Sequence, residues 1–316
     1  MPFLSSRRNK ARLAPELDDG ELGKVLKSLR RTVGSGPVAP TDARVSELAR
    51  FMEAHPADWD RRAHRLSVLA DQLSGSRLPA AWASRDPRDA TALVLDAWSA
   101  LVRGRAEGAM EDASSTAKQC VLAAELAPED PAPWVVLLGV ARVERYRQSD
   151  VFGLWNEILA RDRWHREAYL GMLGYLSPEE AGSRVQVLDF VDSVRARMPA
   201  NAPCAAVELT AQVRQYHALM TRGGVEPMVA RNHWTGAPAT EALDRVWHTW
   251  PQQAFFHHAG ALADLNLLAY ALTAADRRQQ AVPAFEALGN TVTAWPWNHD
   301  GPALTEFESA RGRPAI

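Results

Sequence analysis

The sequence contains very little lysine and no long apolar run. Of its 36 basic residues only four are lysines (Lys10, Lys24, Lys27 and Lys118), and the formal net charge is −2. A chain with this charge lacks the basic footprint of nucleic-acid-binding proteins. No apolar run approaches the roughly 18 residues that would span a bilayer. The sequence therefore predicts neither a nucleic acid nor a membrane as partner.

Cysteine is scarce as well. Cys120 and Cys204 are the two cysteines in 316 residues, and they belong to no metal-ligand spacing. Both stand among small apolar residues, which predicts buried thiols in a reducing compartment. Near the N-terminus, Ser5-Ser6-Arg7-Arg8 occupies the place where a signal peptide needs its apolar stretch. We therefore expect a cytoplasmic protein.

Motifs for catalysis and cofactor binding are also missing. No Gly-x-Ser-x-Gly elbow and no His-Glu-x-x-His motif occurs. The segment Gly34-Ser35-Gly36-Pro37 lacks the lysine and the following serine or threonine of a phosphate-binding loop. No cofactor is expected. The carboxylates are scattered over polar helix faces, so a paired acid–base site is unsupported but stays open.

Helical spacing of apolar residues dominates what the sequence does contain. Leu22, Val25, Leu26 and Leu29 predict a short amphipathic helix, and helix starts recur near positions 58, 89, 130, 164 and 202. Asp58, Asp89 and Asp130 stand where N-caps are needed, and Ser177-Pro178-Glu179-Glu180 has the spacing of a capping box. Strand patterns are nearly absent, which predicts an all-α fold.

Three segments repeat a common helix-pair pattern. The clearest is Leu265-x2-Leu268-Ala269-x2-Leu272 followed by Ala281-x3-Phe285-x2-Leu288. Residues 95–124 and, more weakly, 134–163 have similar spacing, and the helix starts are about 31 to 41 residues apart, close to the tetratricopeptide period of ~34. Over roughly residues 58–290 the chain resembles tetratricopeptide-like helical repeats. The resemblance implies a right-handed α-solenoid of antiparallel helix pairs, with an unrelated helical bundle as the alternative.

Breaks in the pattern indicate three regions. Residues 1–40 are expected to form a basic tail and the short helix, with a break at Val33-Gly34-Ser35-Gly36-Pro37. Residues 41–290 would be the helical-repeat domain, and residues 291–316 a C-terminal cap or tail. Because tryptophan is costly to leave in water, Trp295-Pro296-Trp297 predicts either a cap over the last helix pair or a patch that a partner covers.

The last third of the chain collects histidine and tryptophan. Such side chains can hold a metal or close over a flat or cationic ligand. His257 and His258 are adjacent, however, and adjacent residues of a helix point about 100° apart and cannot share an ion, so no metal site is predicted. Packing and a small-molecule pocket both stay open for this group of candidates: His217, His257, His258, Trp234, Trp247, Trp250, Trp295 and Trp297.

The architecture favours protein recognition. The inner helices of a solenoid form a concave face that reads an extended segment or a helix of a partner, and Arg142, Arg145 and Arg147 are candidates for binding acidic partners. We therefore expect a non-catalytic interaction scaffold or adaptor for a protein or peptide. The alternative is a helical enzyme, or a protein that binds a small molecule or metal in a His/Trp-lined pocket within residues 217–300. A regulatory sensor, which would need another protein to contact DNA, is a third possibility.

Overall fold

The computed structural model describes residues 10–31, 41–54, 58–199, 201–221, 230, 232–250 and 257–312. The prediction of an all-α fold is confirmed, since the two strands of the described residues are two residues long each and the other regular elements are helical. The chain folds as two compact units, one formed by Asp19–Val207 and the other by the residues before and after that range. No helix of the described residues has the length and apolar character to cross a membrane.

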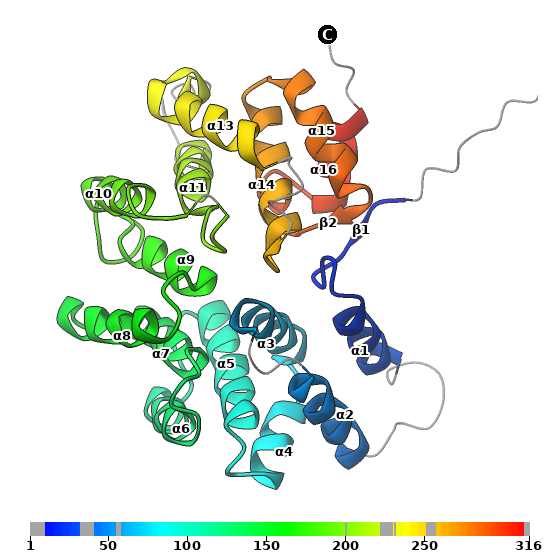
Figure 1. Ribbon diagram of the computed structural model, residues 1–316, viewed down its shortest axis with the longest axis vertical. Helices are drawn as coiled ribbons and strands as arrows, with labels where there is room; N and C mark the ends of the chain where they lie inside the picture. Colours follow the sequence, from blue (N-terminus) through cyan, green and yellow to red (C-terminus); the bar gives the residue numbers. More distant parts are fainter. Residues whose placement is uncertain are drawn as a thin grey trace, which may run out of the picture. The chain divides into compact units, whose positions relative to one another are not determined.

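The first unit is a succession of helices joined mostly by short connections (Figure 1). In chain order these helices are α1 (Gly20–Arg31), α2 (Thr41–Glu53), α3 (Trp59–Leu73), α4 (Leu78–Arg85), α5 (Ala90–Glu107), α6 (Ala113–Leu126), α7 (Ala132–Val143), α8 (Gln148–Arg161), α9 (Arg166–Tyr175) and α10 (Arg184–Arg195).

Alternate helices of this unit pack on one another. Helix α3 contacts α1 and α5, α5 contacts α7, and α7 contacts α9. Helix α5 also packs on α6, and α7 on α8, so the segments 95–124 and 134–163 each form a helix pair as predicted. The helices α5, α7 and α9 therefore lie in a row within the unit (Figure 1).

Local capping explains where several of these helices begin. The side chain of Asp58 accepts a hydrogen bond from the Arg61 amide, and Asp89 accepts from two amides of the first turn of α5. Asp130 accepts from the Ala132 amide at 2.8 Å. These interactions satisfy amides that have no partner inside the helix. Asp58 and Asp89 are confirmed as N-caps. Asp130 caps the first amide of α7 from one residue before the N-cap position, which Pro131 occupies.

The predicted capping box at residue 177 is wrong. Residues 177–181 form turns, and α10 begins only at Arg184, where Ser183 caps the Gln186 amide. The carbonyl of Ser177 instead accepts hydrogen bonds from the amides of Glu180 and Gly182. The Glu180 carboxylate pairs with Arg142, so the acid needed for the capping box has another partner.

Where it is described, the second unit contains helices, short 3-10 turns and two short strands (Figure 1). Its elements are β1 (Arg12–Leu13), α11 (Val207–Thr221), η1 (His233–Thr235), α13 (Ala237–Thr249), α14 (Ala261–Ala274), α15 (Arg278–Leu288), β2 (Thr291–Val292), η3 (Trp297–His299) and α16 (Ala303–Gly312). Helices α14 and α15 pack closely, so residues 265–288 form the predicted helix pair.

Residues from both ends of the chain meet in this unit. Strand β1 pairs in parallel with β2, with Arg12 opposite Thr291. Within the predicted N-terminal tail, residues 11 and 14 are buried alanines, so the part from residue 10 is packed structure. The predicted break at 33–37 lies outside the described residues.

Trp297 lies at the centre of the C-terminal core. Its ring is 2% exposed and packs edge-on against Tyr270 and Phe307. Its indole Nε1 donates to Oδ1 of the buried Asn266 at 3.0 Å. Trp295, by contrast, is 38% exposed. The two tryptophans flanking Pro296 thus have different environments, and Trp297 is the one that covers α14.

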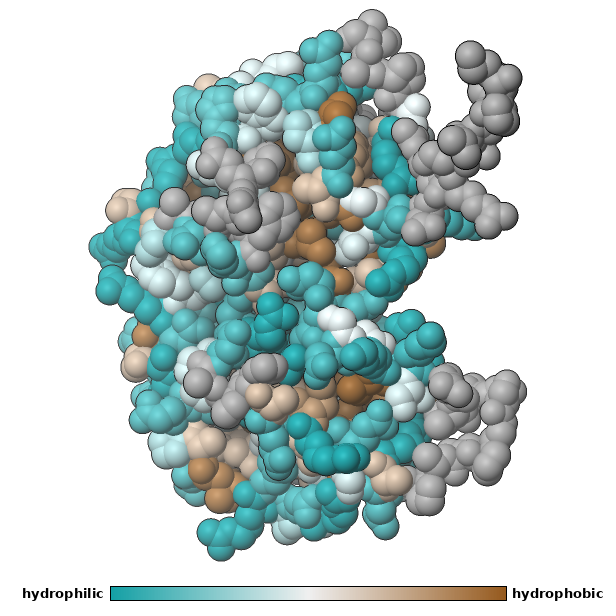
Figure 2. Space-filling view, turned by 45° about the vertical axis from the view of Figure 1, so that its right-hand side comes forward, coloured by the Kyte–Doolittle hydropathy of each residue, from teal (hydrophilic) through white to brown (hydrophobic). Residues whose placement is uncertain are grey.

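The face of the molecule shown in Figure 2 is mostly polar. Hydrophilic residues predominate on it, and hydrophobic residues gather in a few separate patches. Both cysteines are buried, as predicted, and burial raises the pKa of the Cys120 thiol to about 12. This thiol is therefore not poised for nucleophilic chemistry.

Candidate functional site

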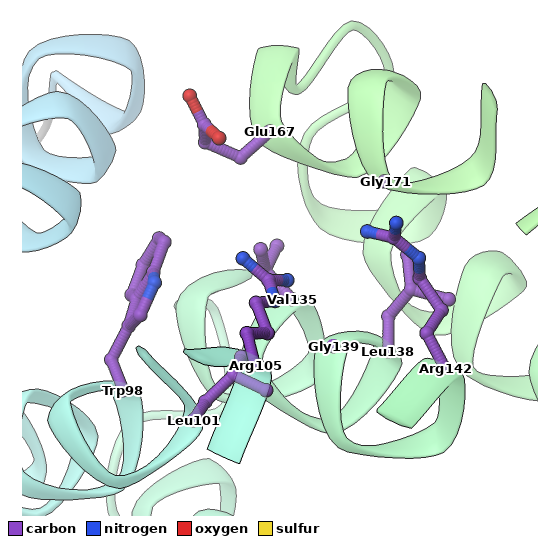
Figure 3. A pocket seen from close by; sticks show the side chains of 9 residues that line it. All are labelled: Trp98, Leu101, Arg105, Val135, Leu138, Gly139, Arg142, Glu167 and Gly171. Atoms are coloured by element: carbon purple, nitrogen blue, oxygen red, sulfur yellow. The ribbon is translucent and has the colours of Figure 1, made fainter. Parts of the chain in front are cut away.

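Helices α5, α7 and α9 line a common depression in the first unit (Figure 3). Its volume is about 20 Å3, room for about one water molecule. Pockets for cofactors or drug-sized ligands measure roughly 300–1,000 Å3. The depression therefore has no room for a whole small molecule. Its lining residues are Trp98, Leu101, Arg105, Val135, Leu138, Gly139, Arg142, Glu167 and Gly171.

Two arginines occupy matching positions in this depression. Arg105 follows Leu101 on α5 with the same spacing as Arg142 follows Leu138 on α7. Figure 3 shows both guanidinium groups extending to the same side of their helices. The leucines are buried, so each anchors its helix while the arginine one turn later reaches the surface.

Glycines on the next helix make room for both guanidinium groups. A Cβ atom at Gly139 of α7 would lie 2.9 Å from Nη2 of Arg105. A Cβ atom at Gly174 of α9 would lie only 2.3 Å from Nη2 of Arg142. The end of each arginine side chain therefore lies against the following helix, at a position where a larger residue would displace it.

The Arg142 guanidinium holds an internal carboxylate. Its Nε donates to Oε2 of Glu180 at 2.9 Å, and its Nη2 donates to Oε1. This is the two-pronged geometry with which arginine recognises carboxylates. The two side chains are 17% and 32% exposed, so water screens the pair, and partly exposed pairs contribute only about 0–1 kcal/mol to stability.

Glu167 reaches the same depression from α9. Figure 3 shows its carboxylate pointing away from both guanidinium groups. Trp98 lies on the α5 side with its ring almost fully buried at 4% exposure. Among the residues that line the depression, Glu167 is the acidic one and Arg105 and Arg142 are the basic ones, and Arg142 is already paired with Glu180.

The three predicted arginines have different surroundings. Arg142 lines the depression. Arg145 is exposed, follows the end of α7, and has a positive φ of 53°. It does not belong to the lining. Arg147 precedes the first turn of α8 and is exposed as well. Of these three candidates the structure brings only Arg142 to this site.

A wider, open hollow of about 630 Å3 runs along α6. Val121 and Leu122 in it are 45% and 40% exposed. This second surface is more apolar than polar, carries Lys118 and Glu125, and has no arginine in its lining, which makes it a suitable comparison for binding experiments. Its lining residues are Ala113, Ser114, Ala117, Lys118, Val121, Leu122, Glu125 and Tyr146.

In the second unit, His217 belongs to a chain of hydrogen bonds. The hydroxyl of Tyr270 donates to Oδ2 of Asp300 at 2.8 Å and lies 2.9 Å from Nε2 of His217. Because the tyrosine proton points to the carboxylate, we assign the proton of the second hydrogen bond to His217 Nε2. A histidine, a tyrosine and an aspartate from three segments thus form one polar chain.

Aromatic stacking closes this chain on one side. The rings of His217 and His299 are stacked at 3.8 Å with an angle of 3° between their planes, and Trp295 packs edge-on against His217. Burial, followed by the charge of His299, lowers the pKa of His217 to about 3. His217 is therefore neutral at physiological pH. Burial, and then the bond to Asp300, raises the pKa of Tyr270.

The other candidates of this region pack in separate places. Trp247 donates from Nε1 to the Gln280 carbonyl at 2.9 Å, and Trp250 is 2% exposed. Trp234 is buried and packs near Tyr216. These tryptophans and Trp297 serve the core of the unit.

His257 and His258 also point to different surroundings. His257 is exposed. His258 is buried, and its Nε2 lies 3.0 Å from Oδ2 of Asp264. Within the part of the chain that the structure describes, no three His, Cys, Asp or Glu side chains are placed to hold a metal ion.

Comparison with family models, with curated proteins and with solved structures finds no match to the chain.

Sequence reasoning missed several members of these clusters, among them Arg105, Tyr270, Asp300, Glu167 and Glu180. Arg105 could have been found, because the Leu-x3-Arg spacing of α5 recurs on α7. Tyr270 and Asp300 carry no such signal. They are far from His217 in sequence, and only the packing of α11, α14 and the segment after Pro296 brings them together.

Proposed function

We propose that this chain is a non-catalytic interaction scaffold of the cytoplasm that binds a protein or peptide on the face formed by α5, α7 and α9. In this proposal the helix pairs belong to a right-handed, tetratricopeptide-like α-solenoid, and the row of alternate helices is its concave face. The observation that carries the proposal is the depression shared by the three helices, with two arginines at matching positions.

The size of the depression supports recognition of a chain rather than of a small molecule. A volume of about 20 Å3 cannot enclose a substrate, since sites for small molecules bury most of the ligand surface. A peptide laid across several helices gains its affinity from many shallow contacts and a few anchors instead. The arginines are the natural anchors, because they offer planar, directional donors.

The alternative function, a small-molecule pocket in residues 217–300, has support from the hydrogen-bonded chain of His217, Tyr270 and Asp300. The stacking distance of 3.8 Å between His217 and His299 leaves no room for a ligand between these two rings. Trp234, Trp250 and Trp297 are buried in the core of the unit. We therefore favour the scaffold.

A peptide-display selection tests the proposal. Random peptides are selected against the immobilised full-length chain, and the affinity of a recurrent sequence is measured for the wild type and two double variants. Arg105→Gln with Arg142→Gln changes the α5/α7/α9 face, and Val121→Ser with Leu122→Ser changes the hollow on α6. We expect the first pair to abolish binding and the second pair to leave it unchanged. No recurrent sequence, or binding that survives the arginine changes, would contradict the proposed function.

A further inference from the structure

The pairing of Arg142 with Glu180 indicates which chemical group the α5/α7/α9 face can bind. The guanidinium of Arg142 already binds a carboxylate through two hydrogen bonds, and that carboxylate comes from the turn between α9 and α10. Glu180 therefore occupies the position that an acidic side chain of a partner would take. We propose that the face binds an acidic peptide segment and that Glu180 is an internal competitor for Arg142. This inference rests on the proposed function.

The local geometry allows Glu180 to leave without unfolding the turn. Amides of Glu180 and Gly182 donate to the Ser177 carbonyl, and the Ala181 amide donates to the Tyr175 carbonyl. A Cβ atom at Gly182 would lie 2.1 Å from the Leu176 carbonyl oxygen, so the turn is closed tightly. The backbone therefore stays in place while the side chain of Glu180 rotates toward water.

The ion pair between Arg142 and Glu180 is weak enough for a partner's carboxylate to displace Glu180. A pair that is 17% and 32% exposed is worth little, because solvent screens the charges and two long side chains must be ordered. A partner carboxylate that brings further contacts along α5 and α7 can replace it. Arg105, at the matching position of the neighbouring helix, is a second cationic group for the same segment.

The matching arginines also indicate the form of the ligand. Neighbouring packed helices are about 8–10 Å apart, and an extended peptide advances about 3.3 Å per residue. Side chains of an extended segment alternate between its two faces, so acidic residues two positions apart, about 7 Å along the chain, would reach Arg105 and Arg142 together. Glu167, whose carboxylate points away from both guanidiniums, disfavours a third acidic residue on the α9 side.

The experiment has two parts, both with the full-length chain. The first is the composition of the selected peptides, which we expect to be enriched in Asp and Glu two residues apart. The second is the affinity of one selected peptide, made with an amidated C-terminus, for the variants Glu180→Gln, Glu180→Gln with Arg142→Gln, and Arg145→Gln. Arg145→Gln is the matched control, since it removes a nearby charge outside the depression.

We expect Glu180→Gln to strengthen binding by about 2–5-fold, the range of a partly exposed ion pair. In the Glu180→Gln background, Arg142→Gln should weaken binding by about tenfold or more, because the ligand's charge-assisted pair of hydrogen bonds is then lost with no internal competitor to offset the loss. Arg145→Gln should leave binding unchanged. Circular dichroism confirms that each variant is folded. Selected peptides without acidic residues that still depend on α5 and α7 would overturn this inference and leave the proposed function standing. Unchanged or weaker binding by folded Glu180→Gln would also overturn it.

Discussion

Arg65 of α3 and Asp19, which precedes α1, form a buried ion pair. Nε of Arg65 donates to Oδ2 of Asp19 at 2.7 Å, and both side chains are less than 5% exposed. Oδ1 of Asp19 accepts from the Leu22 amide at 3.0 Å and so caps α1. Burial tends to raise the pKa of Asp19, but the bonds from Arg65 and Leu22 and the charges of Arg65 and Arg61 outweigh it and lower the pKa.

Asp19→Asn should destabilise the first unit strongly. The change leaves the Arg65 guanidinium buried without its anion, which typically costs about 3 kcal/mol, while asparagine still caps the helix. Asp58→Asn is the matched control: Asp58 is also an N-cap but its side chain is 54% exposed, so little change is expected. Chemical denaturation of both variants measures the difference. Equal midpoints for the two would contradict the account of this pair.

Gly139→Ala should disturb both packing and the depression. The new Cβ would lie 2.2 Å from Cδ2 of the buried Leu101 and 2.9 Å from Nη2 of Arg105. We expect a loss of about 1–3 kcal/mol in the free energy of unfolding, as for other overpacked cores, and weaker peptide binding.

Gly153→Ala is the control for this substitution. Gly153 lies inside α8, and a Cβ there meets nothing within 4 Å. Replacing an exposed helical glycine by alanine usually stabilises by up to about 1 kcal/mol. Denaturation curves should therefore move in opposite directions for the two alanine variants. A stabilised Gly139→Ala variant would show that Arg105 and Leu101 do not depend on this glycine.

Asn266→Ala should destabilise the second unit. The Asn266 side chain accepts from Trp297 Nε1 at 3.0 Å and donates to the Leu262 carbonyl at 2.9 Å and the Thr291 carbonyl at 3.2 Å. Leaving a buried polar group without a hydrogen-bond partner costs about 1–3 kcal/mol. We therefore expect the free energy of unfolding to fall by about 3 kcal/mol, measured by thermal or chemical denaturation. Asn298→Ala, at an exposed position in the same segment, should be nearly neutral.

His217 should remain neutral far below the pH at which histidines usually titrate. With its pKa lowered to about 3, its ring signals in NMR spectra should stay constant from pH 8 to pH 5. His217→Gln identifies these signals by their disappearance. A titration midpoint near the usual value of about 6.5 would contradict the buried stack with His299.

The same pKa gives the sign of a pH effect on stability. The folded state holds His217 neutral, whereas the unfolded chain binds a proton near pH 6.5. The stability contributed by the neutral ring is therefore complete above pH 6.5 and is lost as the pH falls from there toward 3. Wild type should lose more stability than His217→Gln between pH 7 and pH 5.

Local sequence signals predicted the helices well. The apolar stripe from Leu22 to Leu29 became α1, Asp58 and Asp89 are N-caps where expected, and Asp130 caps the first amide of α7 from one residue earlier, since capping is chemistry between near neighbours. The capping box predicted at Ser177 does not form, and the reason is non-local. Arg142, on another helix, binds Glu180, which is the acid that the capping box would have used.

The candidate site could be predicted only in part. Arg142 was identified as a possible anchor, but nothing near it in the sequence tells that Glu180 occupies it. Similarly, histidine and tryptophan drew attention to the last third of the chain, whereas the partners of His217 come from α14 and from the segment after Pro296. Contacts of this kind depend on how helices pack, which a local pattern does not encode.

Amide hydrogen exchange with and without a selected peptide tests the central claim most directly. The full-length chain is compared in both states, and exchange is followed by mass spectrometry along the sequence. Binding on the α5/α7/α9 face predicts slower exchange in the segments that line the depression, residues 98–105, 135–142 and 167–171. Slower exchange confined to α6, or to the segment around Trp295 and Asp300, would contradict it.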